Sequence, residues 1–237
     1  PPPPHPFFYK PTRLSPMLRS LVGSEMCIRD RSYFVKVCGI TNLTDLDLVM
    51  SLPIDGVGFN LYEKSKRFID LNDDVKMSEK LPEHFQVFLI FVNQEKEFIS
   101  KCLAQIPRAM PQFHGEETTE HCESFGRDYI KAIRVKSDTN IEKINKDFKS
   151  AKMLIFDSYD EKEYGGTGKT FDLDLLKDKA EVPFLAAGGI DESNFEDALL
   201  LNNCIGIDVC SSVEDVPGIK NHSKVENLIK KVRSINV

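Results

Sequence analysis

The feature that most constrains the fold of this chain is a regular alternation between short apolar runs and segments with helical spacing, from residue 33 to the C-terminus. Apolar runs rich in β-branched and aromatic residues are typical of strands, and some, such as 86–92, are nearly continuous, as in parallel strands buried on both faces. The expected strands are residues 33–38, 54–59, 86–92, 109–113, 129–135, 152–156, 183–187 and 205–209. The expected helices are residues 43–52, 72–80, 94–105, 118–125, 140–148, 171–176, 192–201 and 223–233.

This alternation predicts an α/β fold, a single-domain (βα)8 TIM barrel over residues 33–237. Eight strand–helix units in about 200 residues match the ordinary size of such a barrel. The short connections and the right-handed crossovers of parallel strands suit the same arrangement. The alternative is an open doubly wound sheet of about five or six strands, which the loss of one or two of the weaker elements would favour.

Residues 1–32 differ from the rest of the chain. They open on four prolines, lack an initiator methionine and show no sustained hydrophobic period. We interpret this segment as a non-native or disordered extension, of the kind produced when adapter sequence in a transcript is translated, and exclude it from the fold. The alternative is a transit peptide, but Glu25 and Asp30 count against it, since such peptides are poor in acidic residues.

Composition narrows the class of function. A net charge of -6 is unfavourable for a nucleic-acid surface, and no run of about 18 apolar residues is present to span a membrane. The six cysteines show no Cys-x-x-Cys spacing and no metal-binding pattern with the five histidines. We therefore expect a cytoplasmic enzyme with reduced thiols that acts on a small molecule, with no metal, no nucleic acid and no membrane as partner.

Two potential proton-transfer residues come directly at the ends of expected strands. Cys38 ends the first strand and Asp157 follows the sixth. The carboxyl ends of parallel barrel strands lie on one face, which is where barrel enzymes bind their ligands. The alternative for Cys38 is a buried cysteine that acts only as a small hydrophobic residue. The barrel prediction places both side chains at one site.

A candidate phosphate site follows the seventh and eighth expected strands. Gly188 and Gly189 follow the seventh, and Ser211 and Ser212 follow the eighth. Barrels commonly bind phosphate here, because glycine lets the backbone approach an anion and serine adds hydrogen-bond donors. A Gly-Gly pair alone is more often a simple turn. Together with the serines, it indicates a phosphorylated substrate.

The glycine-rich segment 164–170, YGGTGKT, ends like a nucleotide-binding P-loop. That pattern requires glycine five residues before Gly168, where this chain has Glu163. We interpret the segment, which includes Gly166, as a mobile lid over the site, because glycines permit large changes in backbone angles.

Several motifs, taken in order, resemble the phosphoribosylanthranilate isomerase family of tryptophan biosynthesis. The motifs are residues 36–41 (KVCGIT), 58–59 (GF), 64–67 (KSKR), 112–116 (QFHGE), 157 (D), 164–172 (YGGTGKTFD), 187–189 (AGG) and 208–211 (DVCS). The resemblance runs from the first strand to the final helix. It implies a (βα)8 barrel that converts N-(5-phosphoribosyl)anthranilate to 1-(2-carboxyphenylamino)-1-deoxyribulose 5-phosphate by an Amadori rearrangement, without a cofactor.

The resemblance also implies roles for individual residues. Cys38 would be the general base, which requires a positive environment or helix N-termini to lower its pKa from about 8.5. Asp157 would be the general acid, with a pKa raised above about 3.9 by partial burial. Arg67 would hold the anthranilate carboxylate, unless it is a solvated member of the basic run 64–67. Asp208 would orient the amino nitrogen or the hydroxyl groups of the substrate, whereas His114 is not assigned a catalytic role.

Two departures from the family pattern are Ser212, where glycine is usual, and Leu173, where tryptophan is common. If position 212 required a positive φ, serine would be strained by about 1 kcal/mol and phosphate binding would weaken. Two alternatives for function follow: the related aminoaldose isomerase of histidine biosynthesis, which has aspartate at the position of Cys38, and a catalytically impaired barrel that only binds sugar phosphates. The sequence does not determine the oligomeric state, and we expect a monomer.

Overall fold

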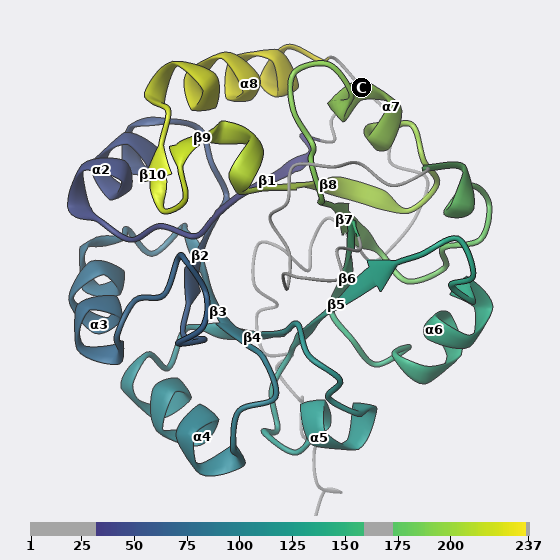
Figure 1. The fold of residues 1–237 in the computed structure, drawn as a ribbon, viewed down its shortest axis with the longest axis horizontal. Coiled ribbons are helices and arrows are strands. Elements are labelled where there is room, and N and C mark those ends of the chain that lie inside the picture. The colour runs from purple at the N-terminus through teal and green to yellow at the C-terminus, as the bar shows by residue number, and fades with distance from the viewer. Residues whose placement is uncertain (1–31, 159–172, 236–237) are drawn as a thin grey trace, which may run out of the picture. The chain divides into compact units, whose positions relative to one another are not determined.

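The computed structural model describes residues 32–158 and 173–235, which belong to one compact unit. Within these residues, eight parallel strands close into a barrel in sequence order, which confirms the single-domain (βα)8 prediction. Figure 1 shows the strands as a central ring with the helices outside it. The strands are β1 (Phe34–Cys38), β2 (Gly56–Asn60), β3 (Gln86–Phe91), β4 (Met110–Phe113), β5 (Ile130–Val135), β6 (Met153–Ser158), β7 (Phe184–Ala186) and β8 (Cys204–Val209).

The pairing of β1 determines which side chains enter the barrel. β1 joins β8 to close the ring, with Lys36 opposite Asp208, and it pairs with β2 on its other edge, with Cys38 opposite Gly58. Successive side chains of a strand point to opposite faces. Lys36 and Cys38 therefore point into the barrel, whereas Val37 packs in the apolar layer beneath the helices.

The helices cover the barrel through apolar faces that are spaced one helical turn apart. The side chain of Asn221 caps the longest of them, α8, by accepting a hydrogen bond from the backbone N–H of Lys224. The buried residues of α8 are Val225, Leu228, Ile229 and Val232. The helices are α2 (Leu43–Ser51), α3 (Leu71–Lys80), α4 (Lys96–Gln105), α5 (Thr119–Glu123), α6 (Ile141–Asp147), α7 (Phe195–Leu199) and α8 (His222–Ser234).

Some expected elements differ from the structure. In the described part of the helix predicted at 171–176, the structure has a short 3-10 helix, η2 (Leu173–Leu175), because two apolar residues with an aspartate between them do not form a continuous apolar face. Residues 171–172 and the proposed lid 164–170, with Gly166, lie outside the described residues. The helix predicted at 192–201 is shorter than expected, since α7 begins only at Phe195.

An additional hairpin follows β8 and was not predicted. A 3-10 turn, η3 (Ser211–Val213), leads into β9 (Glu214–Val216) and β10 (Ile219–Lys220), which pair antiparallel. Thr41 Oγ1 donates to the Gly218 carbonyl over 2.5 Å, and the Lys220 N–H donates to Asp45 Oδ2 over 2.9 Å. These bonds attach the hairpin to the segment that follows β1.

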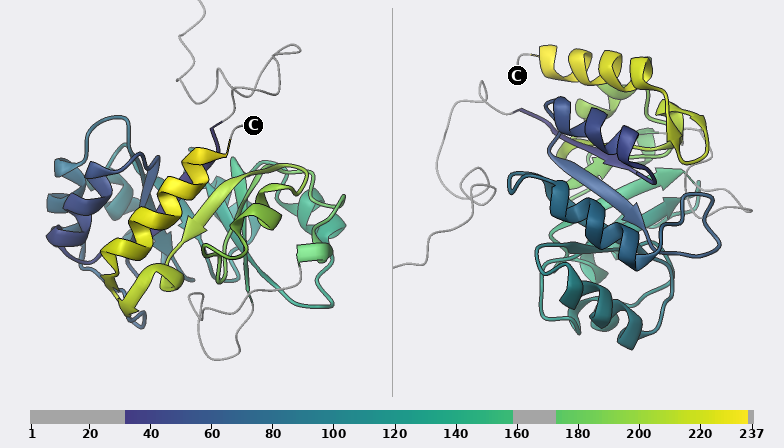
Figure 2. Two further views of the ribbon diagram at one scale, coloured as in Figure 1. Left: turned by 90° about the horizontal axis from the view of Figure 1, so that it is seen from above. Right: turned by 90° about the vertical axis from the view of Figure 1, so that its left-hand side faces the viewer.

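The two ends of the described domain meet at the opposite end of the barrel from this hairpin. Arg233, near the end of α8, donates to the carbonyl of Tyr33 over 2.5 Å and to Asp55 Oδ2 over 2.6 Å. Figure 2 shows α8 running from the hairpin at one end of the barrel to the start of β1 at the other. Among the described helices, none is long and apolar enough to cross a bilayer.

Candidate active site

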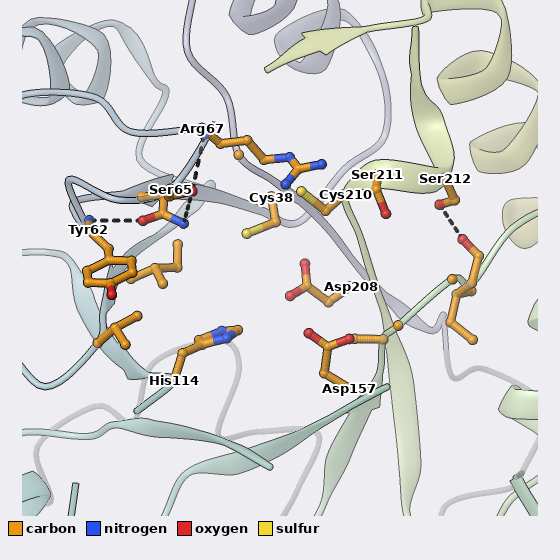
Figure 3. Close-up of a pocket in the computed structure, with 18 residues that line it drawn as sticks. Cys38, Tyr62, Ser65, Arg67, His114, Asp157, Asp208, Cys210, Ser211 and Ser212 are labelled. Atoms are coloured by element: carbon orange, nitrogen blue, oxygen red, sulfur yellow. Dashed lines mark hydrogen bonds between the residues drawn. The ribbon is translucent and has the colours of Figure 1, made fainter. Parts of the chain in front are cut away.

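A pocket opens where the strands of the barrel end, as expected for this fold. It brings together the sequence-predicted residues Cys38, Arg67, Asp157 and Asp208 with the glycine and serine clusters after β7 and β8. Figure 3 shows the charged and thiol side chains directed into this space. The residues that line it are Cys38, Gly39, Asn60, Tyr62, Ser65, Arg67, Ile90, Val92, His114, Asp157, Ala187, Gly188, Gly189, Ile190, Asp208, Cys210, Ser211 and Ser212.

The candidate base and acid enter the pocket from different parts of the ring. Cys38 is the last residue of β1 and is 9% exposed, whereas Asp157 lies near the end of β6 and is 5% exposed. β6 is separated from β1 by β7 and β8, so the two side chains border the same space from non-adjacent strands. This separation leaves room for a substrate between a thiol and a carboxyl group.

A buried ion pair lies directly below Cys38. Lys36 Nζ is 2.8 Å from Asp208 Oδ2, and both side chains are almost fully buried. Burial disfavours the Lys36 ammonium, but the facing Asp208 carboxylate and the Cys38 thiol outweigh it and hold the Lys36 pKa above its usual value. Burial raises the pKa of the Asp208 carboxyl, and the Lys36 ammonium offsets this only in part. Asp208 is thus held in place by a charge that also acts on Cys38.

Arg67 is buried and paired, so it is not the solvated side chain of the alternative interpretation. Its Nε donates to both carboxylate oxygens of Glu214, over 2.9 and 3.0 Å, and its Nη2 donates to Glu214 Oε2 over 2.7 Å. Lys220 Nζ reaches Glu214 Oε1 over 2.7 Å. One carboxylate therefore lies between two buried cations, and the hydrogen bonds from Arg67 hold the Glu214 pKa below its usual range despite burial.

The thiols of Cys38 and Cys210 both line the pocket, and each affects the ionisation of the other. The neighbouring Cys210 thiol, together with burial, raises the pKa of Cys38 above its ordinary value, although the Lys36 ammonium opposes the shift. The prediction that a positive environment lowers the pKa of Cys38 is therefore wrong, because the pKa of this thiol is raised. The Cys38 thiol, aided by the Lys220 and Arg67 cations, instead lowers the pKa of Cys210 to about 6.

The loops after β7 and β8 border the pocket beside these thiols. Gly188 and Gly189 have φ of 70° and 78°, a left-handed conformation that disfavours any residue with a Cβ. Ser212 does not share this geometry, and its Oγ donates to the Ile190 carbonyl over 2.5 Å. The strain considered for serine at position 212 is therefore absent. Ser211 lies next to it along the pocket wall.

His114 lines the pocket but is not suited to donate a proton. Its Nε2 contacts the side-chain amide of Gln112. Burial, with the nearby Lys36 and Lys131 cations, lowers the His114 pKa to about 3, so the ring is neutral near pH 7.

Several residues of the site were not assigned a role from the sequence. Lys36 and Cys210 belong to the motifs 36–41 and 208–211. The alternation of side chains along a strand was enough to place both inside the barrel. Glu214 and Lys220 belong to the unpredicted hairpin. A lysine within an otherwise apolar strand was the available signal for Lys36, because a buried charge needs a partner.

Comparison with known proteins gives one consistent result. The family model described as N-(5'phosphoribosyl)anthranilate (PRA) isomerase matches residues 35–231. An N-(5'-phosphoribosyl)anthranilate isomerase of Legionella pneumophila (strain Corby) is 34% identical over 198 residues, which are 84% of this chain and 96% of that protein. A Neisseria meningitidis serogroup C protein of the same name is 36% identical over 199 residues, again 84% of this chain and 96% of that protein.

Solved structures agree with this match. The phosphoribosyl anthranilate isomerase from Thermotoga maritima has a TM-score of 0.77 and 31% identity, covering 86% of this chain and 100% of that chain. Another phosphoribosyl anthranilate isomerase structure, in complex with reduced 1-(o-carboxyphenylamino)-1-deoxyribulose 5-phosphate, has a TM-score of 0.74 and 29% identity, with the same coverage.

The fold and pocket define a (βα)8-barrel enzyme with a polar site at the carboxyl ends of its strands. The chain belongs to the N-(5'-phosphoribosyl)anthranilate isomerase family. It is an isomerase of tryptophan biosynthesis, as the motifs indicated, and family membership replaces the histidine-pathway alternative.

Proposed function

We propose that this pocket converts N-(5-phosphoribosyl)anthranilate to 1-(2-carboxyphenylamino)-1-deoxyribulose 5-phosphate with Asp157 as general acid and Cys38 as general base. Asp157 gives its proton to the ribose ring oxygen, so that the ring opens to a Schiff base. Cys38 as a thiolate then takes the proton from C2, which leaves an enolamine that tautomerises to the ketone. Both steps are proton transfers, which a carboxyl group and a thiol can perform without a cofactor.

The observation that carries this proposal is the position of Cys38 and Asp157 on non-adjacent strands around one pocket. The ring oxygen and C2 of a ribose lie on different sides of C1, so acid and base must approach from different directions. The Asp157 side chain is 5% exposed and borders the same pocket, so it faces the proposed substrate position and little bulk water. The Lys36 ammonium beside Cys38 favours a thiolate there, in opposition to burial and to the Cys210 thiol.

Substrate binding is proposed to use both ends of the pocket. The substrate phosphate would lie against Gly188, Gly189, Ser211 and Ser212, where left-handed glycines bring backbone close to an anion. The Glu214 carboxylate bonds to Nε and Nη2 of Arg67 among the described residues, so we assign Nη1 as the donor to the anthranilate carboxylate.

Two further roles complete the proposed substrate site. Asp208, held by Lys36, would accept a hydrogen bond from the substrate's amino nitrogen or a hydroxyl group. Gly166 would belong to a loop that covers the phosphate, although it lies outside the described residues.

The test is steady-state kinetics on freshly prepared phosphoribosylanthranilate. Cys38→Ala removes the base but not the phosphate site, so kcat should fall by about 10² to 10⁴ while KM changes little. Asp157→Asn keeps the shape of the side chain but loses its proton, with a similar loss of kcat. Asp47→Asn, on the exposed side of α2, serves as the control. Wild-type kcat in either active-site variant would disprove the assigned role.

We further propose that the catalytic unit is a monomer in the cytoplasm. The proposed base, acid and phosphate-site residues come together within a single barrel, and this supports the monomer proposal. Five cysteines in the described residues are free thiols, which suits a reducing compartment. Activity that persists at concentrations where light scattering gives the monomer mass would support the first point.

A further inference from the structure

The strongest unassigned feature of the site is the second thiol, Cys210. It follows β8 directly, and the β1–β8 register places Lys36 opposite Asp208 and Val37 opposite Val209. The next position in this ladder sets Cys38 beside Cys210. Adjacent strands are about 4.8 Å apart, so two side chains on the same face at paired positions are in contact. Figure 3 shows both sulfurs in the same part of the pocket, which agrees with this placement.

The charges around the two thiols differ. Lys220 Nζ is 3.9 Å from the Cys210 sulfur, and the Arg67 side chain passes close to it, since a Cβ built at Gly39 would lie 3.0 Å from that sulfur and 2.7 Å from Arg67 Cδ. Glu214 Oε1, 4.0 Å from Cys210, carries the opposing negative charge. Two cations and one anion thus surround Cys210.

Cys38 has a more balanced environment. A Cβ built at Gly58 would lie 2.8 Å from the Cys38 sulfur and 3.1 Å from Lys36 Nζ, so the thiol adjoins the ammonium. Asp208 is paired with that same ammonium over 2.8 Å. Asp157 and His114 also line the pocket, the latter as a neutral ring. One cation and its own counter-ion therefore lie next to Cys38.

We propose that Cys210 is a positioning residue for the general base: Cys38 and Cys210 hold a single proton between them, and Cys210 takes that proton when Cys38 faces substrate. This inference rests on the proposed role of Cys38. With one proton on the pair, the thiolate is shared, and its charge is balanced by Lys36 on one side and by Lys220 with Arg67 on the other. When Cys38 takes the proton from C2 of the substrate, both thiols become protonated. As the enolamine tautomerises, that proton passes from Cys38 to C1, while the proton of the C2 hydroxyl group returns to the Asp157 carboxylate, which restores the shared state.

This arrangement resolves the conflict between the raised pKa of Cys38 and its need to be a thiolate. The first proton leaves the pair through Cys210, whose pKa is about 6, so the pair carries one negative charge near pH 7. The raised pKa of Cys38 describes the removal of the second proton. Catalysis requires only the transfer of one proton between two thiols at neighbouring strand positions.

The first experiment measures ionisation without substrate. Brief iodoacetamide pulses from pH 5 to pH 10 are quenched, and the Cys38 and Cys210 peptides are quantified by mass spectrometry, with thiols kept reduced by a phosphine. In the wild type, the pair should become reactive with a midpoint near pH 6. Reaction of both thiols only above about pH 8 would overturn the proposal, even if every variant failed to fold.

The second experiment uses Cys210→Ser, which keeps a small polar group but cannot hold the shared charge. The midpoint for alkylation of Cys38 should rise to about 8.5 or above, and the acidic limb of kcat/KM should move with it. At pH 6.5 this lowers kcat at least about tenfold with little change in KM, and activity returns at pH 9. An unchanged alkylation midpoint and pH profile would refute the proposal.

The matched control is Cys204→Ser, at the other end of β8, where the thiol donates to the Gly206 carbonyl over 3.3 Å. It should leave both midpoints unchanged. Failure of the base assignment is distinguishable: it appears as wild-type kcat in Cys38→Ala, whereas the alkylation midpoints test the thiol pair whether or not Cys38 is the base.

Discussion

Asp74 provides the clearest prediction for pH-dependent stability. It lies in the first turn of α3, is fully buried, and neither carboxylate oxygen has a hydrogen-bond partner among the described residues. Burial raises its pKa to about 8. In the unfolded chain the pKa is about 3.9. Between these values the folded state holds a proton that the unfolded state has lost, so the free energy of unfolding must fall as pH rises from about 4 to 8.

The size of the effect follows from the two pKa values. Each pH unit in this window removes about 1.36 kcal/mol, which gives about 4 kcal/mol at pH 7 and a plateau above pH 8. Asp74→Asn removes the titration and leaves a neutral side chain of similar shape. The variant should match the wild type near pH 4 and be more stable at pH 8 by about 2–4 kcal/mol, since local relaxation reduces the full value.

Urea unfolding at half-unit steps from pH 4.5 to 8.5 measures this difference directly. Asp73→Asn is the control, because Asp73 is its neighbour on the same helix but is exposed and pairs with Lys76. The wild type and the Asp73 variant should show the same decline with pH, whereas the Asp74 variant should show a flatter curve. Parallel curves for wild type and Asp74→Asn would refute the reasoning.

Three further predictions concern the site and its boundary. Glu214→Gln removes the negative charge between the buried Arg67 and Lys220 and should lower the free energy of unfolding by about 3 kcal/mol. The control Glu116→Gln, at an exposed ion pair, should lower it by less than about 1 kcal/mol. Equal losses in urea titrations would contradict this prediction. Gly189→Ala should raise KM severalfold. The control Gly126→Ala, at a glycine with a similar positive φ but open surroundings, should only lower the free energy of unfolding by about 1 kcal/mol. An unchanged KM in Gly189→Ala would exclude a phosphate role for this glycine. Deletion of residues 1–32 should leave kcat and Tm unchanged, because the family match begins at residue 35, and a Tm lower by several degrees would assign the segment to the fold.

Local patterns were sufficient to predict the barrel and the strand ends that form the site. The fold depends on hydrophobic periodicity, which each segment carries in its own sequence, and parallel strands then bring Cys38 and Asp157 to one face whatever their separation along the chain. The sequence also indicated the role of Gly188 and Gly189, since their left-handed backbone conformation favours glycine.

The pairing of charges was not predictable in the same way. Arg67 and Glu214 are separated by 147 positions, and nothing local identifies one as the partner of the other. The hairpin that carries Glu214 and Lys220 has strands of only three and two residues, too short for a period to appear. The pKa of Cys38 depends on such contacts between distant parts of the chain. The sequence therefore indicated the thiol but not the direction in which its pKa is shifted.

The contact of Arg233 with Tyr33 has a consequence for protein engineering. It joins the first and last elements of the barrel on the face away from the catalytic pocket. A short peptide between residues 33 and 235 would therefore bridge neighbouring points, and new termini opened in an exposed loop would give a circular permutant with the same active site. For the same reason, a second enzyme tethered at either of these ends would leave the mouth of the pocket accessible to substrate.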